Sequence, residues 1–209
     1  MQRQDWLLLA LSAAQGNPLS PVQLQKALFL LGEKHPSSVG RGYYHFIPYN
    51  YGPFDRLVYI DAERLRDAGL VSIEQRPGQQ WNEYALTPHG MATATQLRQT
   101  APSQAVDYLD ELVPWTCSQS FESLVRAVYA EYPNMRQNSV FRSGDEPAPE
   151  IPAHTPEGEQ MRRAERIRRE ALSDPKMLAL LDQAHRLREG QECEWVTFDD
   201  LDAKYPAEA

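Results

Sequence analysis

Apolar residues recur at helical spacing along most of the first 140 residues, and this pattern predicts a mainly α-helical fold. Residues 4–14 read as a short apolar helix. Ser20 and Pro21 suit the N-cap and the first position of a second helix, in which Leu24, Leu28 and Leu31 lie on one face. Residues 43–47 alternate well enough to predict a short strand.

A winged-helix arrangement is predicted for the next fifty residues. Residues 54–68 form an amphipathic helix with Val58, Ala62 and Leu65 on its apolar face. Two alternating stretches, 71–74 and 81–86, flank the turn sequence Arg76-Pro77-Gly78 and predict a small β-hairpin. Thr87 and Pro88 then begin a helix that runs to about residue 99.

Two further helices, at residues 105–112 and 120–132, are expected to pack on the winged helix and complete its core. Their apolar positions keep a helical period; in the second helix these are Phe121, Leu124, Val125, Val128 and Tyr129. Ser118 and Ser120 lie near helix starts and read as caps. We therefore expect the first domain to span residues 1–142.

The remainder of the chain predicts a linker at residues 143–158 and a helical tail at 159–209. Residues 144–158 hold four prolines and four acidic residues with no Lys or Arg, a composition typical of extended linkers. The tail is too short to sustain its own core, and its apolar stripes need a cover. The first domain, a second copy of the chain, or a different protein are the candidates.

Charge divides the chain into two halves. Residues 1–100 carry nine Lys and Arg against eight Asp and Glu, whereas the rest carries twelve against twenty-one. The first half could approach DNA, and the second would attract a basic partner. With no apolar stretch of bilayer length and two isolated cysteines, we expect a cytoplasmic protein without membrane contact, disulfide, metal or cofactor.

Several motifs between residues 22 and 142 resemble the SocA-like, or Panacea, antitoxin domain of bacteria and phages. They are QLQKALFL, FIPYNYGPFDRLVYIDAERLRDAGLV, YALTPHG and AVYAEYPNMRQNSVFR, in that order. The resemblance implies a helical, winged-helix-like module that neutralises small toxins by direct binding. The matching motif residues are Lys26, Tyr49, Asn50, Tyr51, Gly52, Pro53 and Phe54.

The tail is similar to the toxin-binding C-terminus of type II antitoxins of the Phd or RelB kind. The similar stretch is ALSDPKMLALLDQAHRLREGQECEWVTFDDLDAKY. This resemblance implies that the tail lies across the active cleft of a toxin, for instance a basic ribonuclease. The residues expected to contact it are Met177, Leu180, Leu181, Ala184, Leu187, Trp195, Phe198, Leu201 and Tyr205.

Two motifs of the first domain allow more than one interpretation. The YNYGPF string could be a contact surface, since exposed tyrosines make good interface anchors, or Gly52-Pro53 could turn into the next helix while Tyr49 or Tyr51 fills the core. The helix at 54–68 could read DNA through Arg56, Tyr59 and Arg66, although several acidic residues share it.

Catalytic signatures are not found in the sequence. The five histidines are scattered, no G-x-S-x-G elbow surrounds a serine, and the glycines lack phosphate-loop spacing. We therefore expect a type II or phage-defence antitoxin rather than an enzyme. The alternatives are a winged-helix transcriptional regulator that binds operator DNA, and an adaptor for a protease. Homodimerisation is open.

Overall fold

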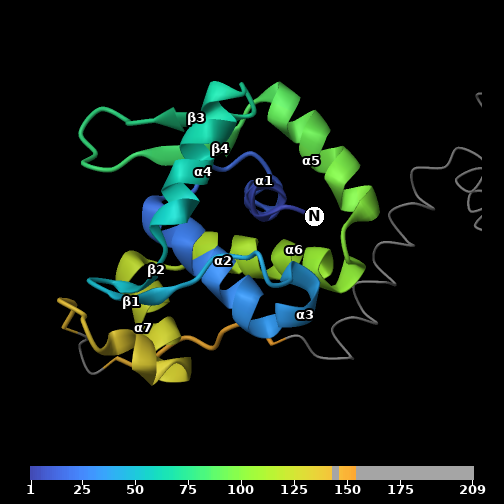
Figure 1. Ribbon diagram of the computed structural model, residues 1–209. Coiled ribbons are helices and arrows are strands. Elements are labelled where there is room, and N and C mark those ends of the chain that lie inside the picture. The colour runs from blue at the N-terminus through green and yellow to red at the C-terminus, as the bar shows by residue number, and fades with distance from the viewer. Residues whose placement is uncertain (143–145, 154–209) are drawn as a thin grey trace, which may run out of the picture. The chain divides into compact units, whose positions relative to one another are not determined.

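Figure 1 shows the computed structural model of the protein, which describes residues 1–142 and 146–153. The chain divides into two units, Met1–His154 and Thr155–Ala209, and the described residues belong to the first. They form seven α-helices, one 3-10 helix and two antiparallel hairpins. The predicted fold class, mainly α with a small β-hairpin, is confirmed, and a second small hairpin joins it. None of these described helices has the length and apolar character that crossing a bilayer requires.

The first helix, α1 (Arg3–Ala13), lies at the centre of this unit and is seen end-on in Figure 1. It is apolar on all sides, and Trp6 to Leu11 are all buried. Helices α2, α4, α5 and α6 contact it from different directions. A helix without a polar face needs such an all-round cover, which explains the architecture.

Helix α2 (Pro21–Lys34) carries the predicted core stripe: Leu24, Leu28 and Leu31 are fully buried. The Ser20 hydroxyl accepts a hydrogen bond from the backbone N–H of Gln23, and the Gln23 side-chain oxygen accepts one from the backbone N–H of Ser20, so the predicted cap is a complete capping box. The short helix α3 (Pro36–Val39) follows.

The YNYGPF string forms a β-hairpin rather than a turn into the next helix. Strands β1 (Ile47–Tyr49) and β2 (Gly52–Phe54) pair antiparallel, with Tyr49 opposite Gly52. The strand predicted at 43–47 is wrong, because the Tyr43 ring packs beside Gly32 and its hydroxyl donates to the Leu28 carbonyl oxygen of α2 at 2.8 Å.

The winged-helix elements agree with their prediction. Helix α4 (Arg56–Asp67) buries Val58, Ala62 and Leu65, and strands β3 (Val71–Glu74) and β4 (Glu83–Leu86) form the wing. Thr87 caps α5 (Pro88–Thr100) by accepting from the Gly90 N–H at 3.0 Å.

Helices α6 (Ser103–Ser118) and α7 (Phe121–Glu131) complete the unit, followed by the 3-10 helix η1 (Pro133–Arg136). Leu124, Val125 and Val128 are buried as expected. Phe121, predicted in the same stripe, is 43% exposed; it is the first residue of α7, and its ring contacts Tyr51 and Phe141 rather than the core. Ser120 caps α7 as predicted, whereas Ser118 donates to the Trp115 carbonyl oxygen within α6.

Part of the segment expected to be a linker packs onto the folded unit. Ile151 is only 5% exposed and belongs to the hydrophobic core. Glu146 pairs with the buried guanidinium of Arg126 at 2.7 Å. The chain is therefore anchored to the first unit past residue 142, the position at which we expected the domain to end.

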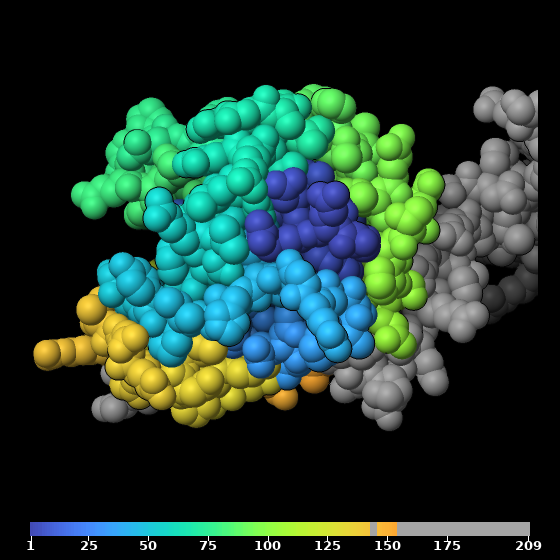
Figure 2. All heavy atoms as spheres, viewed as in Figure 1, coloured from blue at the N-terminus to red at the C-terminus, as the bar shows by residue number. Residues whose placement is uncertain are grey.

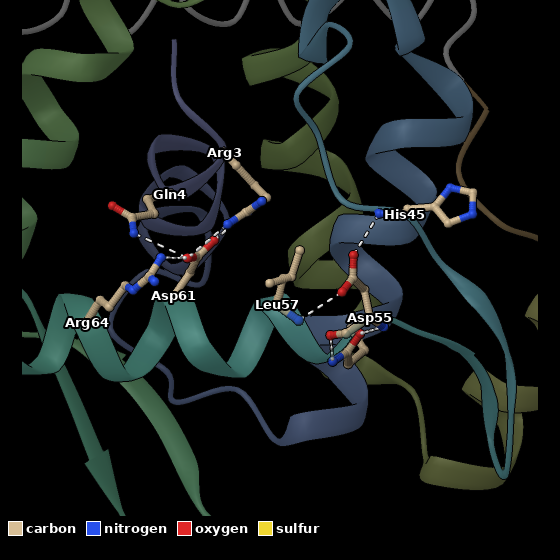
Figure 3. A network of polar contacts seen from close by, with 8 residues as sticks. Arg3, Gln4, His45, Asp55, Leu57, Asp61 and Arg64 are labelled. Atoms are coloured by element: carbon tan, nitrogen blue, oxygen red, sulfur yellow. Dashed lines mark hydrogen bonds and ion pairs between the residues drawn. The ribbon is translucent and has the colours of Figure 1, made fainter.

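A buried carboxylate holds α1 against α4. Asp61 is fully buried and accepts hydrogen bonds from Arg3, at 2.6 and 3.2 Å, and from Gln4 at 3.2 Å; Arg64 lies 3.4 Å away (Figure 3). Burial alone would raise the pKa of Asp61, but these hydrogen bonds and the charge of Arg3 outweigh it, so the pKa lies below its ordinary value.

Replacing this carboxylate by an amide should weaken the fold at neutral pH. We expect Asp61→Asn to lower the free energy of unfolding by about 2 to 3 kcal/mol, because Arg3 loses a buried partner. Since the folded pKa is depressed, the loss should be full above about pH 4 and should fade as acid protonates the wild-type carboxylate. Urea unfolding at pH 7 and at pH 3 measures both values. Asp67→Asn, at an exposed ion pair with Arg66, is the control and should change little; equal losses in both variants would contradict the assignment.

Candidate functional site

A small hollow lies between the β1–β2 hairpin and the start of α2, and it gathers the motif residues found in the sequence. Its volume is about 150 Å³. Tyr59 of α4 forms one wall. The other lining residues are Val22, Gln25 and Lys26 from α2, and Tyr49, Asn50, Tyr51, Gly52, Pro53 and Phe54 from the hairpin. All seven predicted family-motif residues therefore lie around one space, which we call the Lys26 pocket.

Gln25 fixes the hairpin to α2. Its side-chain amide donates to the Asp55 carbonyl oxygen at 2.9 Å, and its carbonyl oxygen accepts from the Asp55 N–H at 3.0 Å. Asp55 in turn caps α4 by accepting from Leu57 N–H at 2.8 Å, and it accepts from His45 N–H at 2.6 Å (Figure 3). The buried Gln25 side chain thus fixes the end of the hairpin and the start of α4 to helix α2, which lines the pocket.

Lys26 forms the floor of the pocket. The residue is 3% exposed, and its ammonium donates to the Pro53 carbonyl oxygen at 3.2 Å. Burial lowers the pKa of Lys26 to about 7, because the charged form has lost its water. None of the described residues places a carboxylate within ion-pair distance of this nitrogen.

Gly52 is required by the geometry of the pocket. The φ angle of Gly52 is +96°, a backbone conformation that residues with a side chain rarely adopt. A Cβ at this position would lie 3.1 Å from the Tyr129 ring and 3.4 Å from the Lys26 Nζ. A larger residue at position 52 would therefore crowd the Tyr129 ring and strain the hairpin turn.

An exposed apolar surface adjoins the pocket. Tyr49 and Tyr51 line the pocket, yet they are 48% and 43% exposed. The Tyr51 ring meets Phe121 edge-on at 5.2 Å, and the Val140 N–H donates to the Asn50 carbonyl oxygen. Figure 2 shows the hairpin lying against α7 and the segment after it. We call this surface the hairpin patch; its residues are Ile47, Tyr49, Tyr51, Phe121 and Val140.

Exposure decides between the two interpretations of the tyrosines. Neither Tyr49 nor Tyr51 fills the core, so the structural interpretation of their side chains is wrong. Tyr49 instead stacks on Phe54 at 4.9 Å between ring centroids. Both tyrosines present part of their rings to solvent, as a contact surface requires.

The residues proposed to face DNA do not lie together on one exposed face. Arg56 and Arg66 are exposed on α4, and Arg66 pairs with Asp67 at 2.9 Å. Tyr59 is half-buried between Phe54 and Tyr84, and burial raises its pKa. Tyr59 therefore belongs to the pocket side of α4.

The predicted tail contacts lie outside the described residues; they are Met177, Leu180, Leu181, Ala184, Leu187, Trp195, Phe198, Leu201 and Tyr205. Sequence reasoning missed Ile47, Phe121 and Val140 as surface residues and Gln25 as a positioning residue. The available signal for Gln25 was its place beside Lys26, between the apolar residues Leu24 and Ala27 of the helix.

Comparison of the chain with protein-family models finds no match, and comparison with curated proteins finds none either.

Proposed function

We propose that the protein is an antitoxin that neutralises a cognate toxin in the cytoplasm by direct protein binding. The observation that carries this proposal is the arrangement of the seven motif residues around one pocket, next to an exposed aromatic surface. Interfaces concentrate their binding energy in a few aromatic and charged anchors at their centre. The hairpin patch supplies such aromatic residues on a rigid hairpin.

The hairpin patch is the surface that we propose to contact the toxin. Its rings are held in place by stacking and by backbone hydrogen bonds, so little conformational freedom is lost on binding. The acidic tail, for which we propose contacts with a basic toxin, would add steering to this contact.

Growth rescue tests the proposal. The chain is co-expressed with each protein encoded beside its gene, and a toxic product that it neutralises and co-purifies with identifies the partner. In the full chain, the pair Tyr51→Ala and Phe121→Ala should weaken toxin binding by about 30-fold, as expected when central aromatic anchors are lost.

Trp81→Ala is the matched control, because Trp81 is 49% exposed on the wing loop and lies outside the patch. It should bind and rescue as the wild type does. Full rescue by the patch variant, together with loss of rescue by Leu180→Ser and Leu187→Ser, would assign the contact to the tail and contradict the patch.

A transcriptional regulator is the second candidate, because α4 and the β3–β4 wing have the order of a winged helix and Arg56 and Arg66 are exposed. Specific retention of DNA from upstream of its gene, lost in both Arg56→Ala and Arg66→Ala, would favour this function. One protein can be both an antitoxin and a regulator, so DNA binding would not exclude the antitoxin function. Only the absence of any neutralised toxin would exclude it.

A further inference from the structure

The Lys26 ammonium has more donors than partners. A lysine ammonium carries three N–H groups, and among the described residues only the Pro53 carbonyl oxygen accepts from it. Of the described residues that line the pocket, none is an Asp or Glu. A buried cation without a counter-charge is unfavourable, so an anion that entered the pocket would find a strong partner.

The size of the pocket restricts the ligand. A volume of about 150 Å³ holds roughly five water-sized groups. Drug-sized ligands and cofactors occupy about 300 Å³ or more. A carboxylate with one or two methylenes fits this space, and the aromatic walls from Tyr49, Phe54 and Tyr59 suit the methylenes.

The surroundings favour a carboxylate that belongs to a protein. Tyr49 and Tyr51 line the pocket and also belong to the hairpin patch, so a protein that covers the patch covers the mouth of the pocket. The carboxylate of Asp55, the residue that follows the hairpin, is already engaged by the His45 and Leu57 N–H groups. Tyr59 lines the pocket and the Tyr129 ring lies beside Gly52. Burial raises the pKa of both phenols, so they are neutral at physiological pH and supply no negative charge.

We propose that the Lys26 pocket receives an Asp or Glu side chain of the protein partner, whose carboxylate pairs with the Lys26 ammonium while aromatic residues of the hairpin patch close around it. This assignment rests on the antitoxin function proposed above and adds the chemistry of the central contact. Because water is excluded on docking, the pair would be buried, where truncating one member has its largest effect on affinity.

The pocket can be tested without the partner. Propionate reproduces the end of a glutamate side chain, and propionamide has the same shape without the charge. The chain contains four lysines, so the Lys26 side chain can be followed by NMR in lysine-labelled full-length protein. We expect saturable shifts of the Lys26 signal with propionate, a raised pKa of Lys26, no response to propionamide, and no saturable shift of the other three lysine signals; Lys26→Met identifies the Lys26 signal by its loss. Absence of a propionate response would overturn the pocket.

Binding of the partner provides the second arm. Lys26→Met should weaken the complex with the neutralised toxin by about 30-fold or more, the effect of removing one member of a buried charge pair. The control is Lys34→Met, at a lysine on the same helix that pairs with Glu131, which should leave affinity unchanged.

The two arms separate the claims. Suppose that propionate binds but that Lys26→Met keeps its affinity for the partner. The pocket would then be a site for small free anions, and the proposed pairing of Lys26 with a partner carboxylate would be wrong. If the hairpin-patch variant loses binding while Lys26→Met binds fully, the antitoxin function stands and only the proposed Lys26–carboxylate pair is wrong. If no toxin is neutralised by the wild-type chain, the proposed function fails, whatever propionate does.

Discussion

Lys26→Met should stabilise the fold near neutral pH. Burying the charged ammonium costs free energy, which the lowered pKa of about 7 reports, against about 10.4 for an exposed lysine. After allowing for the lost hydrogen bond to the Pro53 carbonyl oxygen, we expect a gain of about 2 to 4 kcal/mol at pH 6. A stabilising change that also removes binding would mark Lys26 as a residue kept for function.

The pH dependence of this gain follows from the direction of the shift. Between about pH 7 and pH 10.4 the unfolded chain holds the proton that the folded chain has released, so the stability of the wild type rises with pH through this range. The advantage of Lys26→Met should therefore be largest at or below pH 7 and should nearly vanish by about pH 10.4. Urea unfolding at pH 6 and pH 10 measures it. A destabilised variant at pH 6, or a gain independent of pH, would contradict the burial of a charged amine.

Gly90→Ala should destabilise the protein severely. A Cβ at this position would lie 1.9 Å from the carbonyl oxygen of Leu70. The Leu70 oxygen cannot move away freely, because it accepts a hydrogen bond from the Thr87 N–H at 3.1 Å. The Thr87 hydroxyl also donates to the carbonyl oxygen of Gly69, the residue before Leu70. We expect a loss of about 3 kcal/mol or more in the free energy of unfolding.

The loss at Gly90 should be specific to this contact. Met91 is the next residue of α5 and is 38% exposed, so Met91→Ala should change stability by less than about 0.5 kcal/mol. Chemical denaturation followed by circular dichroism measures both variants. Wild-type stability in Gly90→Ala would mean that α5 can move away from the α4–β3 connection, which contradicts a tight contact between Gly90 and Leu70.

The helices and the wing could be predicted because their signals are local. The capping box at Ser20, the stripe of Leu24, Leu28 and Leu31, and the wing turn each lie within a few residues of sequence. The seven residues that the sequence singled out as a motif all line one pocket, and the function of that pocket stays a prediction.

The surface around the pocket could not be predicted because it depends on contacts between distant segments. Phe121 keeps the helical period of a core residue, yet its position at the start of α7 leaves it beside Tyr51. The burial of Lys26 depends on Gln25 binding the backbone of Asp55, thirty residues away. Periodicity within one helix carries no information about either contact.

The central position of α1 has a consequence for how the chain folds as it is made. The apolar surface of α1 is synthesised before the helices that cover it, and α6, which covers one side, ends only at Ser118. At typical synthesis rates, the hundred residues in between take about 5 to 20 seconds. Throughout that time the apolar surface of α1 lacks part of its cover, which makes the nascent chain a natural client for chaperones that act during translation.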